Sequence, residues 1–156
     1  MAQHDEPIDW SADTLDSRDI EGRVEYLEGE IAIDDETREE LVERSAGYTS
    51  DDLENAELPT PYLDDDERAE LIEELTKLKE FTAYSSGYSG DWRFGTTLIA
   101  DDYFVDYAKE YAEDIGAIDE EARWPANHID WDAAADDLRT DFTAVEDPDG
   151  NTWWVR

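Results

Sequence analysis

The N-terminal half of the chain alternates stretches of helical periodicity with stretches that have none. Residues 1–14 show no sustained period and contain a proline, which predicts a flexible acidic arm with Trp10 as a docking point. After this arm, apolar residues recur at steps of four, three and four, and this stripe predicts a helix that begins at Asp16 and Ser17. The stripe consists of Ile20, Val24, Leu27 and Ile31. A separate second helix is predicted over residues 35–44, where Leu41 and Val42 are the clearly apolar positions.

A segment rich in residues that favour turns follows, and it predicts a flexible connector near residues 46–62. A third helix is expected after Asp64, Asp65 and Asp66, because carboxylates favour the N-terminal end of a helix. Its predicted apolar face is formed by Leu71, Ile72, Leu75 and Leu78. Residues 15–84 are therefore interpreted as a helical region interrupted by the connector.

Residues 85–156 are interpreted as an α+β module. Asp101 or Asp102 is expected to cap a helix that ends before Gly116, and Asp130 to cap a shorter helix that runs through Leu138. The inward face of the first helix is expected to carry Phe104, Ala108, Tyr111 and Ile115. Two short strands, 143–146 and 152–155, flank an Asp-Pro-Asp-Gly turn and predict a β-hairpin. The expected core of this module combines Trp131 and Phe142 with one or two of Val145, Trp153 and Val155.

This pattern predicts the fold class α+β, mainly helical, with N-terminal helices followed by a C-terminal helix-helix-β-hairpin module. The composition supports a folded chain, because 39% of the residues are hydrophobic and 12% are aromatic. Cysteine is absent, which excludes disulfides, thiolate metal sites and a cysteine nucleophile. Without a recognisable secretory signal or a long apolar run, we expect a cytoplasmic protein that makes no membrane contact.

The charge is the most unusual property of the sequence. Asp and Glu number 46 against 12 Lys and Arg, so the net charge is -34 and direct binding to nucleic acid or anionic lipid is disfavoured. One explanation is adaptation to molar salt, where the Debye length is about 3 Å and self-repulsion is screened. The other explanation is imitation of DNA. Imitation of DNA requires the carboxylates to be clustered on one side of the molecule, because the average surface charge density of this chain as a compact monomer is roughly half that of a duplex.

Three predicted helices carry acidic residues at steps of about four, which places the carboxylates in rows about 6 Å apart. On the second helix these rows are Glu36 with Glu40 and Glu39 with Glu43. Like-charged pairs at this spacing cost a few tenths of a kcal/mol each, so stability alone does not favour them. Acids at helix N-termini need no such explanation, because they cap the helix and complement its dipole. The candidate partner-binding residues in these rows are Asp66, Glu70, Glu73, Glu74, Asp102, Asp106, Glu110, Glu113 and Asp114.

Candidates for catalysis are few. His4 lies in the predicted arm and His128 precedes a helix cap, so neither a histidine-based triad nor a multi-histidine metal site is predicted. The run from Asp147 to Asn151 is similar to the start of an EF-hand loop but lacks its glycine and its final glutamate, so it is interpreted as a turn. We therefore predict a protein without enzymatic activity, cofactor or metal; weak divalent cation binding at Asp64, Asp65 and Asp66 is the alternative.

Several motifs resemble a family of small acidic proteins found in phages, plasmids and integrated elements. The matching segments are TLDSRDIEGRVEYLE, TLIADDYFVDYAKEYAEDIGAI, WPANHIDWDAAADDLRTDFTAVE and GNTWWVR, which cover roughly 80 of the 156 residues. Residues 129–138 and 142–155 are also distantly similar to the last domain of ArdA-type antirestriction proteins, which are elongated, dimeric DNA mimics.

This resemblance implies a DNA mimic that binds and inhibits a host DNA-binding or nuclease protein of the restriction or another defence system. It also implies a homodimer as one option for the assembly. The alternative function is an acidic protein-interaction or regulatory module that is adapted to salt and does not imitate DNA.

Overall fold

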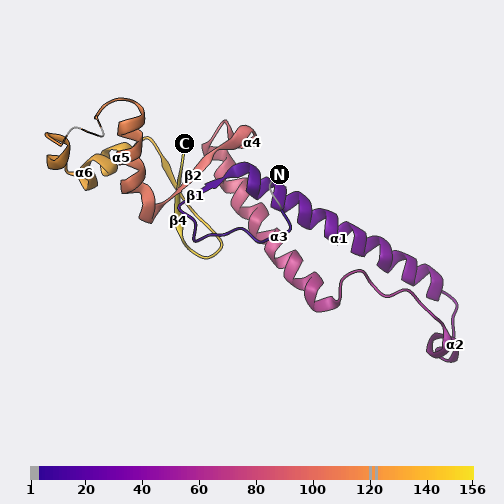
Figure 1. Cartoon of the computed structure of the whole chain (residues 1–156). Coiled ribbons are helices and arrows are strands. Elements are labelled where there is room, and N and C mark those ends of the chain that lie inside the picture. The colour runs from indigo at the N-terminus through magenta and orange to yellow at the C-terminus, as the bar shows by residue number, and fades with distance from the viewer. Residues whose placement is uncertain (1–3, 120, 122) are drawn as a thin grey trace.

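The computed structural model describes residues 4–119, 121 and 123–156. A four-stranded antiparallel sheet with the order β1-β2-β4-β3 lies between two helical layers (Figure 1). Its strands are β1 (Thr14–Asp16), β2 (Thr97–Ala100), β3 (Thr143–Glu146) and β4 (Thr152–Val155). The longer helices are α1 (Ser17–Ser45), α3 (Asp65–Ser85), α5 (Phe104–Asp114) and α6 (Trp131–Arg139). The shorter ones are α2 (Ser50–Asn55), α4 (Trp92–Gly95), η1 (Ser86–Tyr88), η2 (Asp101–Tyr103) and η3 (Ala126–His128). The predicted α+β, mainly helical class is confirmed.

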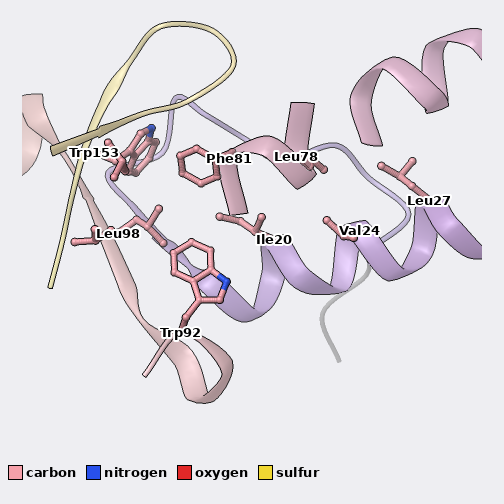
Figure 2. Close-up of a cluster of buried hydrophobic side chains, with 10 residues drawn as sticks. Ile20, Val24, Leu27, Leu78, Phe81, Trp92, Leu98 and Trp153 are labelled. Atoms are coloured by element: carbon pink, nitrogen blue, oxygen red, sulfur yellow. The ribbon is translucent and has the colours of Figure 1, made fainter. Parts of the chain in front are cut away.

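One face of the sheet packs on α1, α3 and α4 (Figure 2). Alternate residues of the strands point to this side, as the two-residue period of a strand requires. The buried cluster consists of Ile20, Val24, Leu27, Leu78, Phe81, Trp92, Leu98, Val145, Trp153 and Val155. This core therefore contains residues from both predicted regions, the helical region 15–84 and the α+β module 85–156.

The N-terminal residues pack along the molecule. The Trp10 ring meets Phe81 and Trp153 edge to face, with centroid distances of 5.2 and 6.2 Å, so its predicted role as a docking point is confirmed. The His4 ring lies on Gly22 of α1, where an added Cβ would come within 2.3 Å of the imidazole. These contacts hold residues 4–13, which we call the N-terminal strap, against the helices. The strap leads directly into the edge strand β1.

The opposite face of the sheet packs on α5 and α6. Its buried residues are Ile99, Phe104, Ala108 and Ala135, with Phe142 and Trp154 packed against them. Phe142 thus lies on the other side of the sheet from Val145 and Trp153, and Trp131 is half-buried and belongs to neither cluster. The predicted shared core of the C-terminal module was therefore wrong, because neighbouring residues of one strand face different layers.

The ends of α5 also differ from the prediction. Asp101 and Asp102 form part of η2, and Tyr103 occupies the position before the first residue of α5 without a side-chain cap. Ile115 is exposed by 59% rather than facing inward, while Gly116 follows the helix end as expected. Asp130 caps α6 by accepting a hydrogen bond from the backbone N–H of Ala133, which confirms that prediction.

The terminal hairpin has the predicted strands, with Val145 opposite Trp153. Its turn is held by the buried carboxylate of Asp147, which accepts hydrogen bonds from the backbone N–H groups of Asp149 and Asn151. The same carboxylate accepts from the indole N–H of Trp153 at 2.8 Å. Gly150 has a φ of 86°, a conformation that favours glycine. The Asp147 side chain thus organises the turn, as its interpretation as a turn residue predicts.

The helix α1 is continuous where two helices were predicted. It spans 29 residues, or about 44 Å, and projects beyond the sheet beside the antiparallel helix α3 (Figure 1). No glycine or proline occurs from Ile31 to Ser45, so the sequence contains no helix breaker between the two predicted helices. The helix α3 begins as predicted, with Asp64 and Glu67 forming a capping box, but Ile72 is 40% exposed. The predicted connector contains the short helix α2.

The molecule is extended. Its accessible surface is 10500 Å², against about 8000 Å² for a compact monomer of this mass. Every residue from 28 to 77 is described by the structure, and the one side chain buried among them is that of Asp34. Within the described residues, no helix is both long enough and apolar enough to cross a bilayer.

Candidate functional site

The negative charge is distributed unevenly along the chain. Residues 28–70 comprise the distal half of α1, the connector with α2, and the start of α3; we call this segment the acidic arm. It holds 17 acidic and 3 basic residues, a net charge of -14. Residues 71–100, by contrast, hold 4 acidic and 3 basic residues, a net charge of -1. The carboxylates are therefore concentrated in two regions, the acidic arm and residues 101–141, which hold 14 acidic and 3 basic residues.

Part of the acidic arm has a width close to that of a DNA duplex. Where α1 lies beside the first turns of α3, two helices of about 10 Å each give a width of about 20 Å; farther out, the connector and α2 accompany α1 (Figure 1). The part of α1 in the arm is about 27 Å long, and α2 lies beyond its end (Figure 1). The net charge of -14 is thus spread at about one charge per 2 to 3 Å, against one per about 1.7 Å along a duplex.

Most acidic side chains of the arm are open to solvent. Those that are exposed and form no ion pair with any described residue are Glu36, Glu39, Glu43, Asp51, Asp52, Glu54, Glu57, Asp64, Asp66, Glu67 and Glu70. They lie on α1, on α2 and its flanking connector, and at the start of α3. A surface of this kind offers many carboxylates to a basic partner at once.

The arm is held together by one buried carboxylate. Asp34 of α1 is fully buried and accepts hydrogen bonds from Nε of Arg38 at 2.7 Å and from Nη1 of Arg68 at 2.6 Å. Its second oxygen accepts from the backbone N–H of Leu63 at 2.8 Å. Arg68 also pairs with Asp35 on α1. This cluster joins α1, the connector and α3 at a level where the arm has no apolar core, and two basic side chains offset its charge.

Burial by itself would raise the pKa of Asp34. The hydrogen bonds from Leu63, Arg38 and Arg68 outweigh this effect and hold the pKa at about 2, below the ordinary value of 3.8. Because the folded state has the lower pKa, the ionised carboxylate stabilises the fold above about pH 4. This contribution is lost as the pH falls towards 2.

Replacing Asp34 with asparagine is therefore expected to lower the melting temperature at neutral pH, because two guanidinium groups lose their shared acceptor. The difference in melting temperature between the parent and Asp34→Asn should be constant above pH 4 and shrink towards pH 2. Comparing the two proteins removes the general effect of protonating the other acids. A difference that stays constant down to pH 2 would contradict the assigned role of this carboxylate.

The predicted row on α3 divides into two parts. Asp66 and Glu70 are exposed on the acidic arm, as expected of partner-binding residues. Glu73 is paired with Lys77 at 2.8 Å. Glu74 receives two hydrogen bonds, of 2.7 and 2.8 Å, from the buried guanidinium of Arg23 on α1. Glu74 therefore connects two helices and is half-buried; its assignment as a partner-binding acid stays a prediction.

The predicted row on α5 lies on the other side of the sheet. Asp102 in η2 and Asp106, Glu110 and Asp114 on α5 are exposed, whereas Glu113 is half-buried. Glu110 accepts a hydrogen bond of 2.7 Å from the hydroxyl of Tyr103, and this bond, with burial, raises the pKa of Tyr103 to about 12. The structure does not bring the rows of α3 and α5 together on one helical surface, because α3 and α5 pack on opposite faces of the sheet.

Sequence reasoning missed the acidic arm as a unit. The available signal was the net charge of successive segments, which changes from -14 over residues 28–70 to -1 over residues 71–100. This difference in net charge identifies the arm only when it is known that α1 continues past Ile31 and runs beside α3. The exposed acids Glu36, Glu39 and Glu43 on α1 belong to this surface; the sequence pattern placed them in acidic rows, but they were not named as partner-binding residues.

The two histidines lie on different elements of the molecule, His4 in the N-terminal strap and His128 in η3. His4 packs on Gly22 and its backbone carbonyl accepts a hydrogen bond from Arg23, while His128 is exposed in η3. Among the described residues, no three acidic, histidine or cysteine side chains are placed to hold a metal ion. Asp64 instead forms the capping box of α3, and Asp65 forms an ion pair with Arg38.

Comparison of the chain with protein-family models, curated proteins and solved structures finds no match.

Proposed function

We propose that the protein is a DNA mimic whose acidic arm occupies the DNA-binding cleft of a host nuclease or other DNA-binding protein and inhibits it. The observation that carries this proposal is the placement of many exposed carboxylates, which form no ion pair with any described residue, on an arm that projects from the sheet (Figure 1). The arm has nearly the linear charge density of DNA, and it projects free of the sheet (Figure 1). A cleft shaped for a duplex can admit such an arm.

Binding of this kind depends on charge. Lys and Arg side chains that contact phosphates in the DNA complex would contact carboxylates of the arm in the mimic complex. The affinity should fall as salt is added, although fewer condensed counterions are released from a folded protein than from a duplex. Asp34 and its two arginines hold α1 and the start of α3 side by side, so the carboxylates are ordered before binding.

The second candidate is an acidic protein-interaction module whose charge is an adaptation to salt. Two observations favour it: the chain contains three lysines against 46 acids, and residues 101–141 hold 14 acidic and 3 basic residues. Negative charge at both ends of the molecule keeps a protein soluble in concentrated salt, and this role does not require imitation of DNA. This alternative predicts no competition with DNA.

The proposal is tested by assaying a panel of DNA-cleaving enzymes, comprising type I and type II restriction enzymes and an RNA-guided nuclease. At least one should be inhibited at low salt, and added duplex DNA that lacks the cleavage site should relieve the inhibition. If none is inhibited, or if the inhibition persists in excess competitor DNA, the second candidate replaces the mimic.

A further inference from the structure

Two surface hollows adjoin at the N-terminal strap. The first has a volume of about 600 Å³ and is lined by strap residues 8–13, the start of η2 and the hairpin turn. The second has a volume of about 400 Å³ and lies between the strap, α3 and the hairpin turn. Both are lined by Ile8, Trp10 and Asp149, so the hollows meet along these residues. We call the combined depression the strap furrow.

The strap furrow has apolar residues along its length and acidic residues around them. The partly exposed Ile8 and Trp10 line both hollows, and Ala100 lines the first, while the buried Leu78 and Trp153 lie beneath them. The acids of the first hollow are Asp9, Asp13, Asp101, Asp102 and Asp149, and none of the described residues that line it is Lys or Arg. In the second hollow, the positive charge of Lys77 is offset by its pairing with Glu73.

We infer that the strap furrow binds an extended, Lys- or Arg-rich segment of a partner protein. Long basic side chains have an aliphatic stem and a charged head, so they suit a groove with an aromatic wall and carboxylate rims. The carboxylates line the whole length of the first hollow, from the strap to η2 and the hairpin turn, and charge complementarity therefore favours a cationic chain over an acidic or neutral one. Two adjoining hollows also suit an extended ligand better than a compact one.

The strap furrow is a different surface from the acidic arm, which we propose as the DNA mimic. The strap furrow is concave and lies beside the sheet, whereas the acidic arm is a projecting rod whose exposed acids lie on α1, α2 and the start of α3. Of these acids, Glu70 alone lines the furrow. Peptide binding by the strap furrow can therefore be tested independently of nuclease inhibition, because the proposed ligand is a flexible basic segment and not a DNA-binding cleft.

The test uses calorimetric titration of the full chain with an eight-residue peptide of alternating lysine and alanine at 0.15 M KCl. The furrow variant Asp13→Asn, Asp102→Asn and Asp149→Asn removes three exposed carboxylates whose side-chain oxygens accept no hydrogen bond from any described residue. The control variant Asp132→Asn, Asp137→Asn and Asp141→Asn removes three exposed carboxylates outside the furrow and has the same net charge. Melting curves establish that both variants remain folded.

The parent should bind the lysine peptide, and the furrow variant should bind it about tenfold more weakly, while the control variant changes affinity less than about twofold. An analogous peptide with glutamine in place of lysine should not bind. Equal weakening in both variants would show that the peptide responds to net charge alone and would overturn the inference. Spermine bound as tightly as the peptide, with the same loss in the furrow variant, would also overturn it, because an extended polypeptide would then not be required.

Discussion

Replacing Trp153 with alanine is expected to destabilise the protein by about 3–5 kcal/mol. The side chain is fully buried at the centre of the cluster between the sheet and α1 and α3 (Figure 2). Its ring packs edge to face on Trp10, and its indole N–H donates to the buried carboxylate of Asp147. The substitution thus removes core volume, detaches the N-terminal strap and leaves Asp147 without one of its donors.

Chemical denaturation of Trp153→Ala and of the matched variant Trp131→Ala measures this effect. Trp131 is half-buried and belongs to neither buried cluster, so its replacement should cost about 1 kcal/mol. The comparison controls for the general loss of a tryptophan. Similar losses in both variants would contradict the placement of Trp153 inside a buried cluster and of Trp131 outside both.

Raising KCl from 10 mM to 2 M is expected to increase the melting temperature by on the order of 10 °C. The net charge of -34 opposes the compact state in dilute buffer, and molar salt screens this repulsion. The acidic arm should respond most, because it combines the highest charge with little apolar burial. Its backbone amides should therefore exchange with solvent faster at low salt than those of α3 near Leu78.

A thermal melt at each KCl concentration, together with hydrogen exchange by mass spectrometry, tests this prediction. Sucrose at matched osmolarity serves as the control, because it stabilises proteins without screening charge. A melting temperature that does not change with KCl, or equal exchange in the arm and around Leu78, would contradict the account.

The local elements were largely predictable because short-range physics determines them. The cap at Asp64, the cap at Asp130 and the Asp-Pro-Asp-Gly turn each combine a specific residue with a fixed neighbour, so sequence spacing is sufficient. The apolar stripe from Ile20 to Leu27 is buried as predicted because it is the contact face of one helix.

Features that depend on distant partners were not predictable from one sequence. Beyond Ile31, α1 continues because Asp34 meets Arg68 from α3, and no local pattern indicates this pair. Glu74 occupies a regular acidic row, yet its partner Arg23 is 51 residues away. The rows on α3 and α5 were correctly recognised as acidic, but their placement on opposite sides of the sheet required the strand order.

The inhibition assay with charge-neutralised variants tests the proposed role of the acidic arm most directly. The arm variant combines Glu36→Gln, Glu39→Gln and Glu43→Gln with Asp66→Asn and Glu70→Gln, all exposed carboxylates of this surface. The control replaces Asp102, Asp106 and Asp114 with asparagine and Glu110 and Glu113 with glutamine, which removes the same number of charges on the opposite side of the sheet.

For the nuclease that the parent inhibits, the arm variant should inhibit about 100-fold more weakly at low salt, with a shallower dependence on salt concentration. The control should remain within about threefold of the parent. Equal inhibition by the parent and the arm variant, or a loss confined to the control, would contradict the claim that the acidic arm takes the place of DNA.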